Sequence, residues 1–118
     1  MCGIAGYFGR RPVATERLDA CAALMHHRGP DGSGRYAHER AGRHVQLLHS
    51  RLSIIDLDSR AGQPFRDGAQ VTVFNGEIYN YLERREELTK RNEAFRTESD
   101  TEVLARLIRR DGVGGLDC

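Results

Sequence analysis

The sequence of 118 residues has no apolar run near the roughly 20 residues that a helix needs to cross a bilayer. Its N-terminus also lacks the charged stretch and apolar segment of a secretion signal. The charges almost cancel, because 18 basic residues stand against 17 acidic ones and leave a formal charge of +1. Neither nucleic acid nor an anionic membrane is attracted by a nearly neutral field, so we expect neither as a partner.

Cysteine is scarce, and the sequence contains no Cys-x-x-Cys pair. Three cysteines (Cys2, Cys21 and Cys118) cannot all pair within one chain, so the composition fits a reducing cytoplasm. The five histidines do not have the spacing of metal ligands either. We therefore expect no metal site, and a metal-binding module is the weakest alternative for this chain. That module would have to use His26, His27, His38, His44 and His49.

The length is sufficient for one small domain with a single core. Strands are expected over residues 1–8, 44–49, 52–57 and 71–74, where the apolar runs are short. The segment HHRGPDGSG at 26–34 holds three glycines, a proline and an aspartate, which indicates a loop. Residues 62–68 are expected to be a further connection.

Three helices are expected between and after these strands. The first follows Thr15, which can cap it, and has one buried face. That face is expected to hold Leu18, Cys21, Ala22 and Met25.

The second helix begins at Glu77, where the pattern changes to a helical period, and runs for about three turns. Its periodic residues are Ile78, Leu82, Arg85 and Leu88. The third follows Ser99, which forms an S-x-x-E capping box with Glu102, and ends at Asp111 with arginines in its last turn. Strands that alternate with helices in this way indicate an α+β domain.

Cys2 is the first residue with chemistry of its own. Removal of Met1 would leave Cys2 with both a thiol and a free α-amine. Thiols are only slightly ionised at neutral pH, so a cysteine nucleophile needs a base, and the α-amine is a base that always lies beside this sulfur. The alternative is that Cys2 is a small apolar residue at the start of a buried strand. Position alone does not decide between them.

Asn75 and Gly76 follow the expected strand at 71–74. An Asn-Gly pair between apolar runs is typical of a β-hairpin. The helical period that follows Gly76 disfavours a hairpin here. A strand that ends in Asn-Gly can instead present a side-chain amide and a backbone N–H together, the two donors that stabilise a tetrahedral oxyanion.

Two charged positions have similar alternatives. Arg51 lies between two apolar runs and is either a solvated turn residue or a residue that binds a carboxylate through two hydrogen bonds. Asp100 is explained by its place in the first turn of a helix, where acidic side chains are favoured. Neither residue indicates a function by itself.

Five segments together resemble the class II glutamine amidotransferase domain, an N-terminal-nucleophile hydrolase, and most closely that of asparagine synthetase. In order they are MCGIAGYFG, HHRGPDGSG, LLHSRLSIIDL, FNGEIYNY and SDTEVL. The forms RGPD, RLSIIDL and NGEIYNY favour asparagine synthetase over the amidotransferases of purine or amino-sugar synthesis.

The resemblance implies a role for each candidate residue. Cys2 would attack the side-chain amide of glutamine, with its own amine as proton shuttle, and Asn75 and Gly76 would form the oxyanion hole. The remaining residues would bind the amino-acid head of the substrate. Arg51 would bind its carboxylate, and Glu77 and Asp100 would bind its ammonium group. Backbone groups near Ile54 and Ile55 would help to frame this head.

The resemblance also implies a fold, a four-layer αββα sandwich that this chain would leave incomplete at its C-terminus. Residues 1–118 would be a partial glutaminase domain, and the ATP-dependent synthetase domain of the family would be absent. The glutaminase step would need no cofactor, since ATP and Mg²⁺ serve the synthetase domain, and a homodimer is possible. Two further alternatives are a truncated non-catalytic remnant or interaction module, and the front domain of a related amidating enzyme.

Overall fold

A computed structural model describes residues 1–53 and 59–116. Its strands are β1 (Gly3–Gly9), β2 (Gly32–Arg40), β3 (Arg43–Arg51), β4 (Phe65–Asp67) and β5 (Gln70–Thr72). Its α-helices are α1 (Thr15–Met25), α2 (Tyr81–Lys90) and α3 (Asp100–Asp111), and short 3-10 turns follow as η1 (His26–Arg28), η2 (Ser59–Ala61) and η3 (Gly112–Leu116). Within these described residues, no helix combines the length and the apolar character that a membrane span requires.

A three-stranded antiparallel sheet forms one half of the molecule, with β3 between β1 and β2. A two-residue turn at Ala41 and Gly42 joins β2 to β3, and both residues have positive φ, 51° and 68°. This conformation matches the right-handed twist of paired strands. The central strand therefore has its hydrogen-bonding groups paired on both edges.

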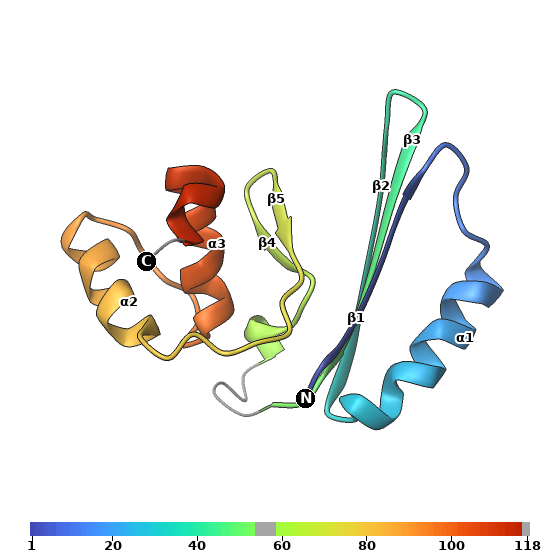
Figure 1. Cartoon of the computed structure of the whole chain (residues 1–118), viewed down its shortest axis with the longest axis horizontal. Helices are drawn as coiled ribbons and strands as arrows, with labels where there is room; N and C mark the ends of the chain where they lie inside the picture. The colour runs from blue at the N-terminus through green and yellow to red at the C-terminus, as the bar shows by residue number, and fades with distance from the viewer. Residues whose placement is uncertain (54–58, 117–118) are drawn as a thin grey trace.

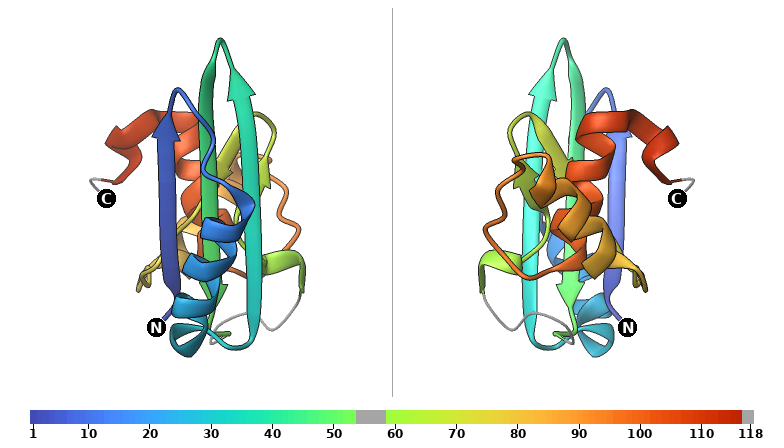
Figure 2. Two further views of the ribbon diagram at one scale, coloured as in Figure 1. Left: turned by 90° about the vertical axis from the view of Figure 1, so that its right-hand side faces the viewer. Right: turned by 90° about the vertical axis from the view of Figure 1, so that its left-hand side faces the viewer.

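Helix α1 packs on one face of this sheet (Figures 1 and 2). The side-chain amide of Gln46 on β3 holds the entrance to the helix, accepting a hydrogen bond from the Val13 N–H at 2.7 Å and donating to the Val13 carbonyl at 3.1 Å. The expected apolar face is turned toward the sheet but only half-buried, since α1 contains no fully buried residue. Thr15 does not cap the helix: the N-cap position is Ala14, and Thr15 is the first helical residue.

The other half of the molecule consists of the β4–β5 hairpin, α3 and α2. Its apolar core is formed by Leu88 of α2 with Val103 and Leu107 of α3, and Tyr81 and Phe95 pack against them. Every residue of α3 from Asp100 to Leu107 is buried. This half is therefore organised around α3.

A buried charge network surrounds the first turns of α3. The Glu102 carboxylate accepts hydrogen bonds from the N–H groups of Arg96 and Thr97 and from the Thr97 hydroxyl, at 2.8–3.1 Å. Arg106 donates to Glu102 at 3.2 Å and to Asp67 of β4 at 2.9 Å. The Ser99 hydroxyl caps the helix by accepting from the Thr101 N–H. The expected reciprocal capping box is absent among these contacts, because Glu102 binds the loop before Ser99 instead of the Ser99 N–H.

The elements lie in layers across the longest dimension of the molecule (Figure 1). Helix α1 covers the outer face of the three-stranded sheet, and the β4–β5 hairpin faces the opposite side of that sheet. Helices α3 and α2 lie beyond the hairpin. The fold is thus α+β, as predicted.

Several predicted boundaries are wrong. Strand β2 was not expected, because glycines and charged residues hide its alternation, and it includes the last part of the predicted loop at 26–34. The connection at 62–68 contains β4, the strand at 71–74 is Gln70–Thr72, and the second helix begins at Tyr81 instead of Glu77. Leu52 and Ser53 are not in a strand, and the rest of the strand predicted at 52–57 lies outside the described residues.

Candidate active site

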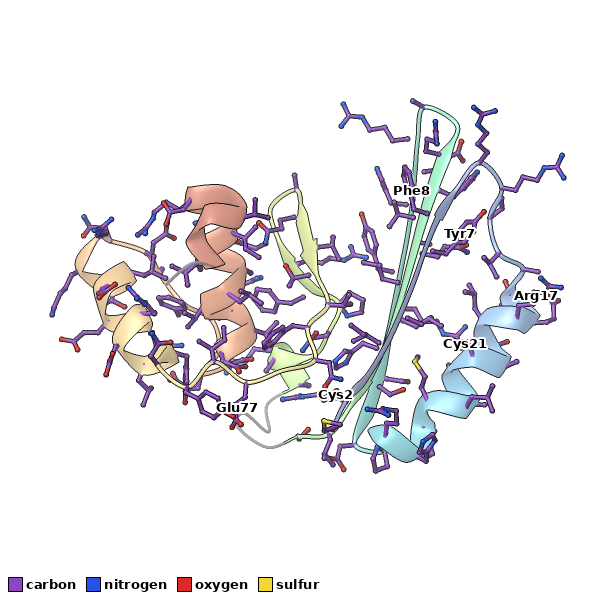
Figure 3. All side chains as sticks on the ribbon, in the orientation of Figure 1. Cys2, Tyr7, Phe8, Arg17, Cys21 and Glu77 are labelled. Carbon is purple, nitrogen blue, oxygen red and sulfur yellow. The ribbon has the colours of Figure 1, made fainter. Side chains whose placement is uncertain are left out.

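A cavity of about 330 Å³ lies where the beginning of β1 and the end of β3 meet the loop after β5 and the start of α3. This is within the range of small-molecule sites. Figure 3 shows Cys2 at the base of the three-stranded sheet and Glu77 on the loop across from it. The cavity is lined by Met1, Cys2, Arg51, Leu52, Ala61, Gln63, Phe74, Asn75, Gly76, Glu77, Tyr79, Ser99, Asp100 and Thr101.

Six of the eight predicted site residues line this cavity, although they come from four separate segments of the chain. They are Cys2, Arg51, Asn75, Gly76, Glu77 and Asp100. The two remaining predictions, Ile54 and Ile55, lie outside the described residues.

Cys2 lies just before β1 and is half-buried. Its Sγ accepts a hydrogen bond from the Leu52 N–H at 3.3 Å and donates to the Leu52 carbonyl at 3.7 Å. The Arg28 Nε donates to the Cys2 carbonyl at 3.4 Å. The thiol is thus held by backbone polar groups at the cavity wall, a different environment from that of a small apolar core residue.

The loop after α1 braces both Cys2 and Arg51, a role that the sequence did not indicate. Gly29 is buried, and a Cβ at this position would lie 2.4 Å from the Ser50 carbonyl oxygen, so no larger residue fits there. The Asp31 N–H donates to the Arg51 carbonyl at 3.0 Å, and the Asp31 carboxylate accepts from the Ser53 N–H at 2.8 Å. These contacts fix the end of β3.

Asn75 and Gly76 are exposed and line the cavity after β5. They do not form a hairpin, because the next element in the chain is α2. The preceding Phe74 N–H donates to the Gln63 Oε1 at 2.6 Å. A Cβ on Gly76 would lie 2.7 Å from the Phe74 ring, so glycine allows the chain to fold back against this ring.

The two acidic residues of the cavity differ in burial. Asp100 is the first residue of α3 and is buried, and its carboxylate accepts from the Ile78 N–H at 3.2 Å. Glu77 is exposed. Among the lining side chains, Arg51 carries the positive charge and Glu77 and Asp100 the negative charges. This arrangement complements a zwitterionic amino acid, which has one carboxylate and one ammonium group.

His49 is a buried residue near the site that sequence reasoning considered only as a metal ligand. It lies on β3 and is 1% exposed; among the described residues neither ring nitrogen makes a hydrogen bond of good geometry, although the Phe74 backbone lies near the ring. Burial lowers the pKa of His49, the Phe74 backbone opposes this shift, and the charge of Arg51 adds to it. The imidazole is therefore favoured as the neutral form. Elsewhere in the described chain, no three His, Cys, Asp or Glu side chains gather in a way that could hold a metal ion.

The family described as "Glutamine amidotransferase domain" matches residues 1–117. The chain belongs to this family. Its amidotransferase domain is of the class II type that occurs in asparagine synthetases, as the five sequence segments predicted.

Curated relatives agree with this assignment. The chain is 43% identical over 116 residues to asparagine synthetase [glutamine-hydrolyzing] 1 of Bacillus subtilis. This alignment covers 92% of the chain and 18% of the relative. It is 40% identical over 122 residues to asparagine synthetase B [glutamine-hydrolyzing] of Escherichia coli, with 99% of the chain and 21% of the relative covered. It is also 36% identical over 127 residues to amidase chry2 of Gibberella zeae, with 96% of the chain and 18% of the relative covered. The chain thus spans about a fifth of the length of these relatives.

Proposed function

We propose that this amidotransferase domain hydrolyses the side-chain amide of glutamine to glutamate and ammonia. The observation that carries the proposal is the single cavity that gathers Cys2, Arg51, Asn75-Gly76, Glu77 and Asp100. A nucleophile, two candidate oxyanion donors, one cation and two acids are the groups that this reaction requires.

In the first half-reaction, Cys2 attacks the carboxamide carbon of glutamine. Removal of Met1 frees the Cys2 α-amine, which takes the thiol proton as the C–S bond forms. The Asn75 side-chain amide and the Gly76 N–H donate to the resulting oxyanion, an interaction worth about 3–4 kcal/mol for each donor. The α-ammonium then gives its proton to the amide nitrogen, the C–N bond breaks, and ammonia leaves a thioester on Cys2.

In the second half-reaction, the α-amine takes a proton from water, and the hydroxide that forms attacks the thioester. The same two donors stabilise the second tetrahedral intermediate. Collapse of this intermediate breaks the C–S bond, returns a proton to sulfur and releases glutamate. No redox step or cofactor is needed for this sequence.

Substrate binding follows from the charges of the cavity. Arg51 holds the α-carboxylate of glutamine, and Asp100 and Glu77 hold its ammonium group, while backbone groups near Ile54 and Ile55 frame the head. Asp100 is already fixed by the Ile78 N–H, so it is oriented before substrate arrives. The reacting amide, which is neutral, then faces neutral donors.

We further propose that the released ammonia serves an ATP-dependent synthetase domain that converts aspartate to asparagine, with ATP and Mg²⁺ used there. The support is the identity of 40–43% to two glutamine-hydrolysing asparagine synthetases. In such a protein the three-stranded sheet and the β4–β5 hairpin would become parts of the two inner layers of a four-layer αββα sandwich.

A second candidate is the front domain of a related amidating enzyme with another acceptor. The similarity to amidase chry2 favours including it. Product analysis separates the two candidates: the protein at its full natural length is given glutamine, ATP and a set of carboxylic acids that includes aspartate. Asparagine as the product supports the first candidate, and amidation of another acid supports the second.

The glutaminase activity is tested by measuring glutamate release in the wild-type protein and in Cys2→Ala. Cys21→Ala is the matched control, because Cys21 is a half-buried cysteine of α1 on the other face of the sheet. We expect Cys2→Ala to abolish release and Cys21→Ala to retain it. A folded wild-type protein that releases no glutamate would favour a non-catalytic interaction module, and intact mass would show whether Met1 is removed.

A further inference from the structure

Gln63 connects two walls of the cavity through its side-chain amide. Its Oε1 accepts a hydrogen bond from the Phe74 N–H at 2.6 Å, and its Nε2 donates to the Thr101 hydroxyl at 3.2 Å. Phe74 immediately precedes Asn75-Gly76, and Thr101 immediately follows Asp100. One amide therefore connects the segment with the proposed oxyanion donors to the helix with the proposed ammonium site.

The backbone of Gln63 is fixed against a third element. A Cβ added to Gly34 of β2 would lie 1.8 Å from the Gln63 carbonyl oxygen, so strand and loop are in direct contact there. Gly34 pairs with His49 of β3, and a Cβ on Gly34 would point at Gln63 and Pro64 just before β4. The side chain of Gln63 thus extends from a backbone that the three-stranded sheet already positions.

The two bonded segments differ in the other contacts that hold them. The Phe74 N–H has no strand partner, because β5 ends at Thr72. Thr101 is buried at the start of α3, where its own N–H binds the Ser99 hydroxyl. The Gln63 amide is half-buried and paired at both ends, so its geometry is defined, and loss of either partner breaks one of these hydrogen bonds.

The geometry points to Gln63 as a positioning residue that sets the distance between the oxyanion donors of Asn75-Gly76 and Asp100. This inference rests on the proposed function, in which one glutamine molecule must be held by its head at Asp100 while its amide carbonyl meets Asn75 and Gly76. A displacement of about 1 Å between such groups can cost on the order of 100-fold in rate.

The first experiment compares Gln63→Met with Gln70→Met in the protein at its full natural length. Gln70 is a matched control, because its amide also donates to a threonine hydroxyl, that of Thr72 at 3.1 Å, but lies away from the cavity lining. We expect Gln63→Met to lower kcat for glutamine hydrolysis by about 10- to 100-fold and to raise KM. Gln70→Met should stay within about twofold of wild type. Wild-type kcat and KM in Gln63→Met would overturn the inference.

A second pair of variants tests the same connection from its other end and does not require Gln63 to be replaced. Thr101→Val removes the hydroxyl that Gln63 binds and nearly keeps its shape, whereas Thr101→Ser retains the hydroxyl. We expect Thr101→Val to lower kcat in the same direction as Gln63→Met, and Thr101→Ser to restore most of it. Equal kcat in both threonine variants would contradict the connection, because a packing role alone would favour valine.

Amide hydrogen exchange separates failure of this inference from failure of the proposed function. In Gln63→Met the amides of Phe74, Asn75 and Gly76 should exchange faster, while those of α1 and β1 should not change. This readout needs no activity. A wild-type protein without glutaminase activity would reject the proposed function alone, and unchanged exchange at Phe74 would reject the role of Gln63.

Discussion

The cavity wall that carries Cys2 is held mainly by backbone hydrogen bonds, whereas the wall that carries Asp100 is held by buried side chains. On the first side, β1 and β2 pair with β3, the Leu52 N–H binds the thiol, and α1 contains no fully buried residue. On the second side, α3 is buried from Asp100 to Leu107, and its Arg106 pairs with Glu102 and with Asp67. Side-chain substitutions should therefore disturb the second wall more than the first.

The largest effect is expected for Glu102→Ala on the second wall. Glu102 is fully buried, and its removal leaves the N–H groups of Arg96 and Thr97 without their partner and takes away one of the carboxylates that Arg106 binds. Breaking a buried pair of this kind costs about 3–5 kcal/mol, which chemical denaturation would measure. Glu86→Ala, at an exposed helix pair with Lys90, is the control and should leave the free energy of unfolding nearly unchanged. Similar losses in both variants would contradict the expected difference.

The next effect is expected on the first wall, at a position without a side chain. Gly34→Ala places a methyl group 1.8 Å from the Gln63 carbonyl oxygen, and the strand and the loop must move apart. Such overpacking costs about 1–3 kcal/mol, and it should also lower glutaminase activity because Gln63 moves.

Gly32→Ala on the same strand is the control for this substitution. Its added Cβ would meet only the Arg51 Cβ at 3.8 Å, an ordinary contact. A tolerated Gly34→Ala would show that the first wall adapts more easily than its close backbone contacts suggest.

A pH-dependent effect is expected at His49, between the two walls. Burial lowers the pKa of His49, so the unfolded chain binds the proton more readily than the folded one. Its contribution to stability is fully present above the ordinary histidine pKa of about 6.5 and is lost as the pH falls toward the lowered value. Melting temperatures between pH 7.5 and 5 should therefore fall less steeply in His49→Gln than in wild type, and equal slopes in the two proteins would contradict this expectation.

The smallest effect is expected for Arg35→Ala on the first wall. Arg35 of β2 forms an ion pair with Asp19 of α1, but both side chains are about half exposed. Exposed pairs contribute about 0–1 kcal/mol, and this contribution falls as salt is added. A loss in Arg35→Ala above about 2 kcal/mol would mean that side chains stabilise α1 on the sheet more than their exposure indicates.

The sequence predicted the elements whose pattern is local. Helix α3 has a cap at Ser99 and an apolar face within one segment, and its end at Asp111 is confirmed. Strand β2 was not predicted, because its pairing depends on β3 and its own residues are mostly glycine and charged. The four-layer arrangement and the roles of the site residues stay predictions. The same holds for the predicted part of Ile54 and Ile55 in binding the amino-acid head.

The positioning residues could not be predicted, because their contacts join distant parts of the chain. Gln63 binds residues 11 and 38 positions away, and no local pattern distinguishes it from a solvated loop glutamine. The bracing role of Gly29 and Asp31 also depends on contacts with residues 50–53, at and just after the end of β3, which lie 20–22 positions away. Recurring motifs indicated which residues gather, whereas the supporting contacts are visible only in three dimensions.

A single loop binds the carbonyls of both Cys2 and Arg51 and so couples the positions of these two residues. If the loop shifts, the attacking sulfur and the carboxylate anchor travel in the same direction, and their spacing is conserved. Sequence changes in this loop would then shift the sulfur and the carboxylate anchor together, relative to Asn75-Gly76 and Asp100 on the opposite wall.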